Sequence, residues 1–198
     1  MLSDGLHEVP SDRIAAVVTS LEMKTRPALR PETAGPWRLQ RLPRPEPDVY
    51  RALYRKIGDE WVWFSRTMMS DAELTKIIWH PQVEVYGLEV SGAFEGLLEL
   101  DFRTEGEAEL AFFGVGPSLV GGGAARWLMN RALEMAWGRP VSRFWVHTCT
   151  MDHPNALAFY MRSGFVPFRR QIEIVADPRL QGICLASRAR TPVLATAS

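Results

Sequence analysis

The stretch VGPSLVGGGAARWL, residues 115–128, decides how the rest of the chain is interpreted. It follows the alternating segment EAELAFFGV (107–115) and leads into a periodic apolar pattern over 123–137, so it joins a predicted strand to a predicted helix. The first N–H groups of a helix have no partner within the helix and carry a partial positive charge. Because glycine and alanine at 121–125 let an anion approach these groups closely, the sequence predicts a phosphate-binding turn.

Two common nucleotide-binding motifs do not fit this turn. A mononucleotide P-loop has a Lys directly after its last glycine, and no Lys follows Gly123. The dinucleotide fingerprint requires a third glycine where Arg126 stands. An ordinary tight turn is the alternative, although each glycine costs about 0.5–1 kcal/mol within a helix.

The segments on either side of the turn alternate between strand and helix patterns. A capping box of Ser70 and Glu73 marks one helix start, and Ser91-Gly92 joins two strands as a hairpin. This order predicts a mixed α/β fold, in which helices flank a mostly antiparallel central sheet. The predicted strands are 37–42, 83–90, 93–102, 107–115, 142–149, 165–175 and 180–187, and the predicted helices are 45–58, 70–78, 123–137 and 155–163.

Residues 1–36 are predicted to be an extension of the folded domain. A short apolar pattern over 12–23 predicts a helix, with Ser11 as a candidate cap, and the prolines and glycine that follow predict a linker. We therefore expect one folded domain over 37–190 and a C-terminal tail at 191–198.

The composition excludes several classes of protein. The 198 residues include 23 Lys and Arg, 23 Asp and Glu, and 46% hydrophobic residues, which is typical of a folded domain rather than a disordered chain. The zero net charge argues against a nucleic-acid binder that acts through bulk charge. No apolar run reaches the ~20 residues of a membrane helix, and the N-terminus lacks the pattern of a signal peptide. We therefore expect a cytoplasmic protein that contacts neither membranes nor nucleic acid.

Charge is unevenly distributed along the chain. Residues 110–198 contain ten Arg and four acidic residues, whereas an acidic run lies before them. One interpretation places an acidic half against a cationic substrate and a basic half against an anionic cofactor. The other interpretation is that the acidic side chains are solvated on strand faces. The run comprises Glu84, Glu89, Glu95, Glu99, Asp101, Glu105, Glu107 and Glu109.

The glycine turn resembles the acyl-CoA pyrophosphate loop of the GNAT superfamily of N-acetyltransferases, which is written V-x-P-x-x-[QR]-G-x-G-[IA]-[GA]. This chain departs from the pattern at Val120, where the family usually has Gln or Arg. The departure removes a polar side chain but leaves the backbone donors in place. The matching residues are Val115, Pro117, Gly121, Gly123, Ala124 and Ala125.

A second block, HPNALAFYMRSGF (153–165), is similar to the N-x-x-A-L-x-x-Y-x-x-x-G-F helix of the same family. His153 stands in the place of the usual Asn, and Asn155 is shifted by two positions. The two blocks occur in the expected order, and the resemblance covers about three quarters of the chain, from 37 to 187. The matching residues are Ala156, Leu157, Tyr160, Gly164 and Phe165.

The resemblance implies an N-acetyltransferase domain over 37–190 with a splayed cleft for acyl-CoA. It implies acetyl-CoA as cosubstrate, no metal ion, and direct acetyl transfer to a primary amine of a small molecule or peptide within a ternary complex. A non-catalytic acyl-CoA-binding or regulatory module is the alternative, and the family also allows a homodimer through the C-terminal strand. The implied CoA-binding residues are Phe113, Val115, Val120, Gly121, Gly122, Gly123, Ala124, Ala125 and Asn155.

The resemblance further implies two catalytic side chains. Glu109 matches the A-E-[IL] strand position of the histone-acetylating branch of the superfamily and is the expected general base. Tyr160 is the expected proton donor to the leaving thiolate. From the residues alone, alternatives remain for both positions. Glu84, Glu99 and Asp101 are rival carboxylates on neighbouring predicted strands, and Tyr160 is equally suited to be a core tyrosine.

The oxyanion donors of the family are backbone N–H groups, which a bulge frees in the strand that carries the base. By register, the resemblance assigns this role to the N–H groups of Phe113 and Val115. Gly114 and Gly116 are suited to such a bulge.

His147, Cys149 and His153 are three side chains of metal-binding type, but no fourth ligand is nearby, so a hydrogen-bonded His and a buried thiol are favoured. Cys149 and Cys184 are expected to be reduced thiols, with a single disulfide as the alternative. The aromatic segment WVWF (61–64) lies where family members often shape the acceptor pocket, so an aromatic-lined amine site is one interpretation of it.

Overall fold

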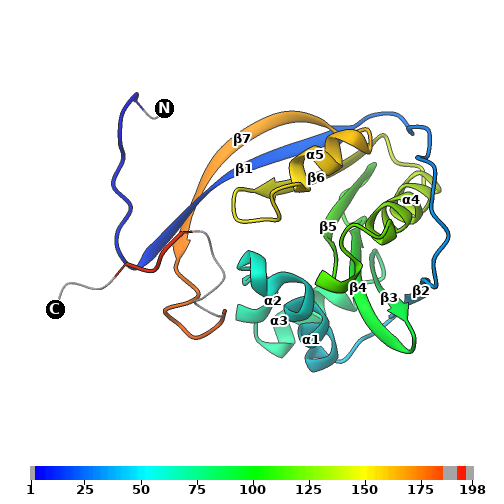
Figure 1. Cartoon of the computed structure of the whole chain (residues 1–198), viewed down its shortest axis with the longest axis horizontal. Helices are drawn as coiled ribbons and strands as arrows, with labels where there is room; N and C mark the ends of the chain where they lie inside the picture. The colour runs from blue at the N-terminus through cyan, green and yellow to red at the C-terminus, as the bar shows by residue number, and fades with distance from the viewer. Residues whose placement is uncertain (1–2, 185–190, 195–198) are drawn as a thin grey trace.

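The computed structural model describes residues 3–184 and 191–194 of the chain. Within these residues a seven-stranded sheet forms the centre, and helices cover both of its faces (Figure 1). The strands are β1 (Arg13–Met23), β2 (Arg38–Arg41), β3 (Val83–Val90), β4 (Ala93–Asp101), β5 (Glu107–Val115), β6 (Arg143–Cys149) and β7 (Val166–Ala176). The helices are α1 (Pro47–Gly58), η1 (Asp59–Trp61), α2 (Ser65–Met68), α3 (Asp71–Ile78), η2 (Pro117–Leu119), α4 (Ala124–Trp137) and α5 (Ala156–Arg162).

The strand order is β2-β3-β4-β5-β6-β1-β7. Neighbouring strands are antiparallel except β5 and β6, which are parallel. The mixed, mostly antiparallel sheet with flanking helices is therefore confirmed. The predicted capping box is also present at α3, where Ser70 Oγ accepts from the Glu73 N–H and the Glu73 carboxylate accepts from the Ser70 N–H.

Strand β4 contributes to two separate cores. Leu97 lies in the core that α1 and α3 cover, together with Tyr50 and Tyr54. Leu98 and Leu100 lie in the other core, which α4 and α5 cover. This division follows from the alternation of side chains along a strand. Among the described residues, none of the helices has the length and hydropathy that crossing a membrane requires.

Residues 12–23, predicted as a helix, contain strand β1 instead. β1 lies between β6 and β7, with Val18 opposite Cys149 on one side and Gln171 on the other. The segment is rich in β-branched residues, and two neighbouring strands pair with its backbone, so sheet pairing prevails over the helix-like spacing. The helix prediction is therefore wrong. The predicted extension 1–36 contributes an inner strand to the sheet.

The segment that connects β1 to β2, predicted as a linker, packs against the domain. It passes the end of α5, where a Cβ on Gly164 would lie 3.0 Å from Pro27. It then passes the start of α4, where a Cβ on Gly123 would lie 3.4 Å from Thr33. Figure 1 shows this segment running alongside α4. The linker therefore bridges the two helices that carry the family-like blocks.

The last predicted strand, 180–187, is not formed where the structure describes it. Residues 180–184 make turns, and the Leu180 N–H donates to the Asp177 carbonyl oxygen at 3.2 Å. Residues 185–187 lie outside the described residues. Among the described strands, β7 lies at one edge of the sheet. The homodimer through the C-terminal strand stays a prediction. The exposed apolar residues of β7 are Val166, Phe168, Ile172 and Ile174.

Removing residues 1–24 is expected to abolish cooperative thermal unfolding. The sheet would lose a strand that pairs on both sides and that buries Leu21 and Met23 in the core. Circular dichroism during heating measures the transition. Removing residues 1–9, which precede the strand, is the control and should shift the melting temperature by less than about 4 °C. A cooperative transition in the longer truncation would show that β1 is dispensable.

Candidate active site

Strands β5 and β6 are paired only at one end. Their parallel pairing runs from Glu107 opposite Arg143 to Glu109 opposite Trp145, and beyond these positions the strands separate (Figure 1). A cavity of about 1000 Å³ opens there, and its walls also include the segment around α2, the turn before α4, and α5. The splayed cleft that the family resemblance implies is therefore present.

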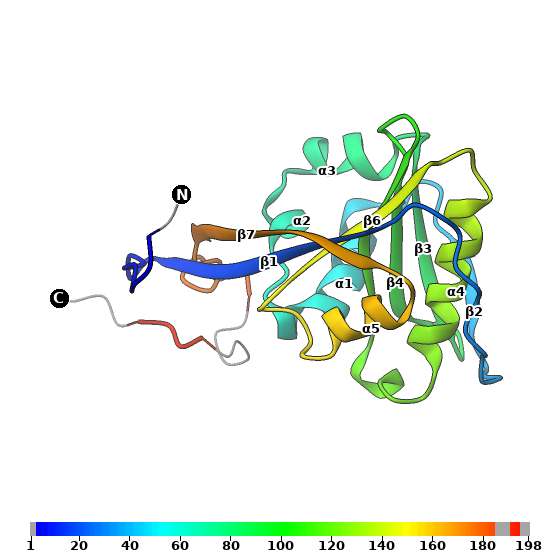
Figure 2. The same cartoon turned by 90° about the horizontal axis from the view of Figure 1, so that it is seen from above.

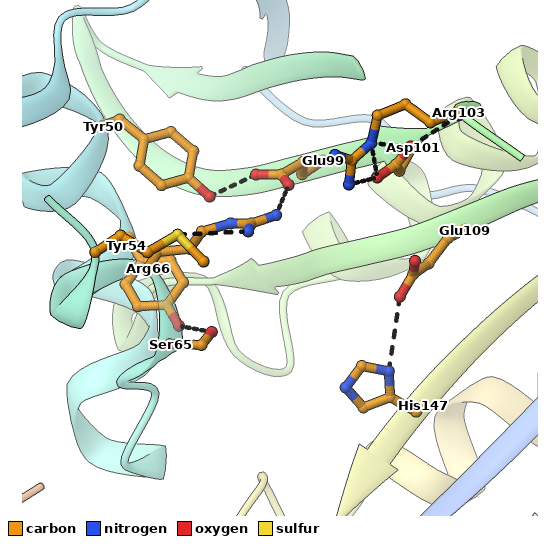
Figure 3. A network of polar contacts seen from close by, with 10 residues as sticks. Tyr50, Tyr54, Ser65, Arg66, Glu99, Asp101, Arg103, Glu109 and His147 are labelled. Carbon is orange, nitrogen blue, oxygen red and sulfur yellow. Dashed lines mark hydrogen bonds and ion pairs between the residues drawn. The ribbon is translucent and has the colours of Figure 1, made fainter. Parts of the chain in front are cut away.

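Glu109 stands at the end of the β5–β6 pairing and lines the cavity. Burial raises the pKa of its carboxyl to about 7, Asp101 adds to the rise, and Arg66 opposes it. Across the cleft, His147 Nδ1 lies 3.8 Å from Glu109 Oε1 (Figure 3). Near neutral pH, a substantial fraction of this carboxyl is ionised and able to accept a proton.

Two carboxylates beside Glu109 are engaged by arginines (Figure 3). Glu99 is fully buried and accepts hydrogen bonds from Tyr50 Oη and Arg66 Nη2, both at 2.5 Å. The side chain of Asp101 accepts from Arg103 Nε at 2.8 Å and from Arg103 Nη2 at 2.5 Å. These charge-assisted bonds are strong and hold both carboxylates in place.

The third rival carboxylate, Glu84, is not part of the cavity wall. It pairs with Arg139 and Arg41 and accepts a hydrogen bond from the Tyr86 hydroxyl. The structure therefore separates Glu109 from all three of its rivals. Glu84, Glu99 and Asp101 are buried and paired within the fold. They are therefore neither solvated on a strand face nor free to bind a cationic substrate.

Tyr160 lies on α5, lines the cavity and is 7% exposed. Its ring packs edge-on against Phe113 of β5 and against Phe165. Burial raises the pKa of its phenol well above the ordinary value, and the charge of Asp152 adds to the rise. The hydroxyl therefore remains protonated at neutral pH and is able to donate a hydrogen bond.

The backbone of the glycine turn adopts a conformation that favours glycine over other residues. Gly121 and Gly123 have φ values of +84° and +93°, in the left-handed region. A Cβ on Gly121 would meet no atom within 4 Å, so the turn is open at this residue. Gly123 is the N-cap of α4, and no side chain caps the helix there. The first N–H groups of α4 are therefore free of a capping side chain and suited to an anion.

Most of the predicted CoA-binding residues line the cavity. Gly122 and Ala124 do not, and the Ala124 side chain is fully buried. At these two positions only backbone groups remain for a ligand. The predicted residues that line the cavity are Phe113, Val115, Val120, Gly121, Gly123, Ala125 and Asn155.

The bulge in β5 lies at a different position from the predicted one. Its register with β4 shifts at Ala111, which is the extra residue. Gly114 instead permits close packing of α1, because a Cβ there would lie 2.4 Å from Ile57 Cγ2. The Gly116 N–H donates to the Glu95 carbonyl oxygen at 2.7 Å. The prediction of a bulge at the two glycines is therefore wrong.

Three arginines that the sequence analysis missed line the cavity with the glycine turn, namely Arg30, Arg126 and Arg162. Arg126 and Arg162 lie within the two family-like blocks, where their positions could have been noticed. Arg30 lies in the predicted linker, where no pattern points to it. Burial and the charges of the other two arginines lower the pKa of Arg30.

A further part of the cavity wall is aromatic. It includes the segment 61–64 and Phe112 of β5, and the Trp63 and Phe112 rings lie 5.4 Å apart. The Arg66 guanidinium lies 5.0 Å from the Phe112 ring centroid. The interpretation of 61–64 as part of an aromatic-lined pocket fits this geometry, whereas the sequence carried no signal for Arg66.

The cysteines are free thiols, as predicted. Cys149 lines the cavity, and burial, with the charge of Asp152, raises the pKa of its thiol to about 11. The thiol is therefore protonated at neutral pH and a poor nucleophile. The His153 ring packs against Trp61 at 5.0 Å. In the described part of the chain, no group of three His, Cys, Asp or Glu side chains is placed to hold a metal ion.

The family model for the acetyltransferase (GNAT) family matches residues 50–165. The chain belongs to this family. No curated protein matches it. Members of the family use acetyl-CoA as the acyl donor, and the residues of this cavity fit that group. The start of α4, which no side chain caps, and the three arginines suit its phosphates, and the cavity of about 1000 Å³ leaves room for its pantetheine arm.

Solved structures share the fold of this GNAT protein. A GCN5-related N-acetyltransferase from Sphaerobacter thermophilus has a TM-score of 0.60 at 14% identity, over 84% of this chain and 52% of that protein. A putative GNAT acetyltransferase from Novosphingobium aromaticivorans has a TM-score of 0.55 at 16% identity, over 84% of this chain and 67% of that protein. An aminoglycoside acetyltransferase from an uncultured soil metagenomic sample, in complex with sisomicin, has a TM-score of 0.53 at 16% identity, over 65% of this chain and 88% of that protein. The chain thus spans about half of the first protein and two thirds of the second.

Replacing Glu109 with Gln is expected to stabilise the protein at high pH. The folded-state pKa of about 7 lies above the ordinary 4.5, so folding favours the neutral carboxyl. This contribution to stability is fully present below about pH 4.5 and is lost as the pH rises through about 7. Between about pH 5 and 8, the wild type should lose about 1–3 kcal/mol of unfolding free energy relative to Glu109→Gln. Urea denaturation measures this difference, and parallel pH profiles would contradict the raised pKa.

Proposed function

We propose that the protein transfers the acetyl group of acetyl-CoA to a primary amine of a small molecule or peptide, by direct attack within a ternary complex. The observation that carries this proposal is the position of Glu109, a carboxyl with a pKa of about 7 in the same cavity as the glycine turn. A base with a pKa near the ambient pH combines a useful ionised fraction with proton affinity. When bound, acetyl-CoA supplies the acetyl group as an activated thioester, so no acyl-enzyme is required.

Residues of the cavity meet each chemical need of this transfer. Glu109 accepts the proton that the attacking amine loses, and the half-exposed His147, 3.8 Å away, passes it to solvent. The N–H groups of Phe113 and Val115 donate hydrogen bonds where negative charge develops. The Tyr160 phenol, which burial keeps protonated, donates its proton to the leaving sulfur.

The aromatic wall supports an acceptor whose amine is attached to an apolar body. Partly exposed rings of the segment 61–64 and of Phe112 offer apolar surface to such a ligand and attract an ammonium group. Two carboxylates beside Glu109, namely Glu99 and Asp101, are already engaged by arginines. This arrangement favours a monoamine over a polycationic acceptor.

A non-catalytic acyl-CoA-binding or regulatory module is the second candidate. Val120, which is 54% exposed, replaces the polar side chain that the family usually has in the loop. Binding of CoA without turnover of any amine would favour this candidate over the transferase.

Release of the CoA thiol, measured with acetyl-CoA and a panel of primary amines, tests the transferase. We expect turnover of at least one alkyl or arylalkyl monoamine, with kcat/KM rising with pH and levelling off above about 7. Glu109→Gln should lower kcat by about 10²–10³-fold and change CoA affinity, measured by calorimetry, by less than about twofold. Glu105→Gln, at an exposed carboxylate after β4, is the control and should change neither quantity. A fully active Glu109→Gln variant would exclude Glu109 as the base.

Tyr160→Phe keeps the ring packing of α5 and removes the proposed proton donor. We expect kcat to fall by about 10–10²-fold while CoA affinity and the melting temperature stay unchanged. Steady-state kinetics and thermal unfolding measure these effects. Tyr86→Phe is the matched control, because the hydroxyl of Tyr86 donates to Glu84 outside the cavity. An unchanged kcat in Tyr160→Phe would remove the acid role.

A further inference from the structure

The segment between β1 and β2 brings an arginine to the cavity from outside the residues that match the family. Arg30 comes from this segment, Arg126 from the first turn of α4, and Arg162 from the last residue of α5. All three line the same cavity as the open glycines of the turn. Three separate parts of the chain therefore place guanidinium groups around one space.

The backbone around Arg30 is anchored to α4. Asn130 Nδ2 donates to the Arg30 carbonyl oxygen at 2.8 Å and to Glu32 Oε1 at 2.7 Å. Arg126 Nη1 donates to the Pro31 carbonyl oxygen at 3.1 Å. Asn130 is 1% exposed, so the anchor lies inside the fold, and Figure 2 shows the segment passing along α4. Arg30 is therefore positioned by the fold rather than carried on a free arm.

In the part of the chain that the structure describes, no carboxylate pairs with any of the three arginines. Glu32, the carboxylate nearest in sequence to Arg30, pairs with Arg131 at 2.5 Å instead. No salt bridge to a carboxylate is formed by Arg30, Arg126 or Arg162 within residues 3–184 and 191–194. The mutual repulsion of the three groups, together with burial, also lowers the pKa of Arg30. A group of neighbouring positive charges of this kind attracts an anion.

We propose that Arg30, Arg126 and Arg162 bind the 3′-phosphate of coenzyme A, beside the glycine turn that takes its diphosphate. The inference rests on the proposed use of acetyl-CoA. A phosphomonoester carries about −1.5 to −2 charge near neutral pH, and its oxygens match the paired N–H groups of guanidinium. The site also accounts for the departure at Val120, because positive charge absent from the loop is supplied by a segment outside residues 50–165.

Isothermal titration calorimetry of the full chain with CoA and with dephospho-CoA tests the site. Dephospho-CoA lacks only the 3′-phosphate, so the ratio of the two affinities reports on this group alone. The wild type should bind CoA at least about tenfold more tightly than dephospho-CoA. In Arg30→Ala the affinity for CoA should fall by about fivefold to tenfold, and the affinity for dephospho-CoA should change by less than about twofold.

Arg26→Ala is the matched control, because Arg26 is exposed on the same segment and does not line the cavity. It should leave both affinities unchanged. Arg162→Ala, at an exposed helix end, should reproduce the selective loss, and thermal unfolding verifies that each variant is folded. Equal affinity of the wild type for both ligands, or equal losses for both in Arg30→Ala, would overturn the inference and leave the proposed function standing. Failure of the wild type to bind either ligand would overturn the proposed function and this inference together.

Discussion

The parallel pairing of β5 with β6 ends at Glu109 and Trp145, and the candidate site depends on that ending. Strands that stayed paired would leave no space between them for a ligand. The extra residue Ala111 interrupts the regular register of β5 where the strands part. Two cores, one on each face of the sheet, hold the separated strands in position. The cavity therefore exists because the hydrogen bonding between β5 and β6 ends at Glu109 and Trp145.

The charges around Glu109 depend on which of the neighbouring carboxylates pair with an arginine. Glu99 is held by Arg66, and Asp101 by Arg103, so both serve the structure of the sheet. Within the described residues Glu109 forms no such contact with an arginine, and burial is the largest influence on its pKa. Its neighbours still tune it, because Asp101 raises its pKa and Arg66 lowers it. Strands β4 and β5 thus carry two carboxylates that stabilise the fold and one, Glu109, whose raised pKa suits proton transfer.

The N-terminal segment has two structural roles. β1 fills the place between β6 and β7, and the chain that follows it lies across α4 and α5. The same path brings Arg30 to the cavity that Arg126 and Arg162 also line. Because one continuous segment provides both a sheet strand and a cavity residue, the completeness of the sheet and the charge of the cavity are coupled.

The sequence by itself determined the glycine turn at 121–125, the capping box at Ser70, the hairpin and most element boundaries, because each depends on backbone preferences over a few neighbouring residues. The family-like blocks also placed Tyr160 on a helix beside the cleft. Only the tertiary structure decided that residues 13–23 form an inner strand, that Glu109 differs from its rivals, and that Arg30 reaches the cavity. These features depend on strand pairing, burial and charges between residues far apart in the chain, which no local pattern encodes.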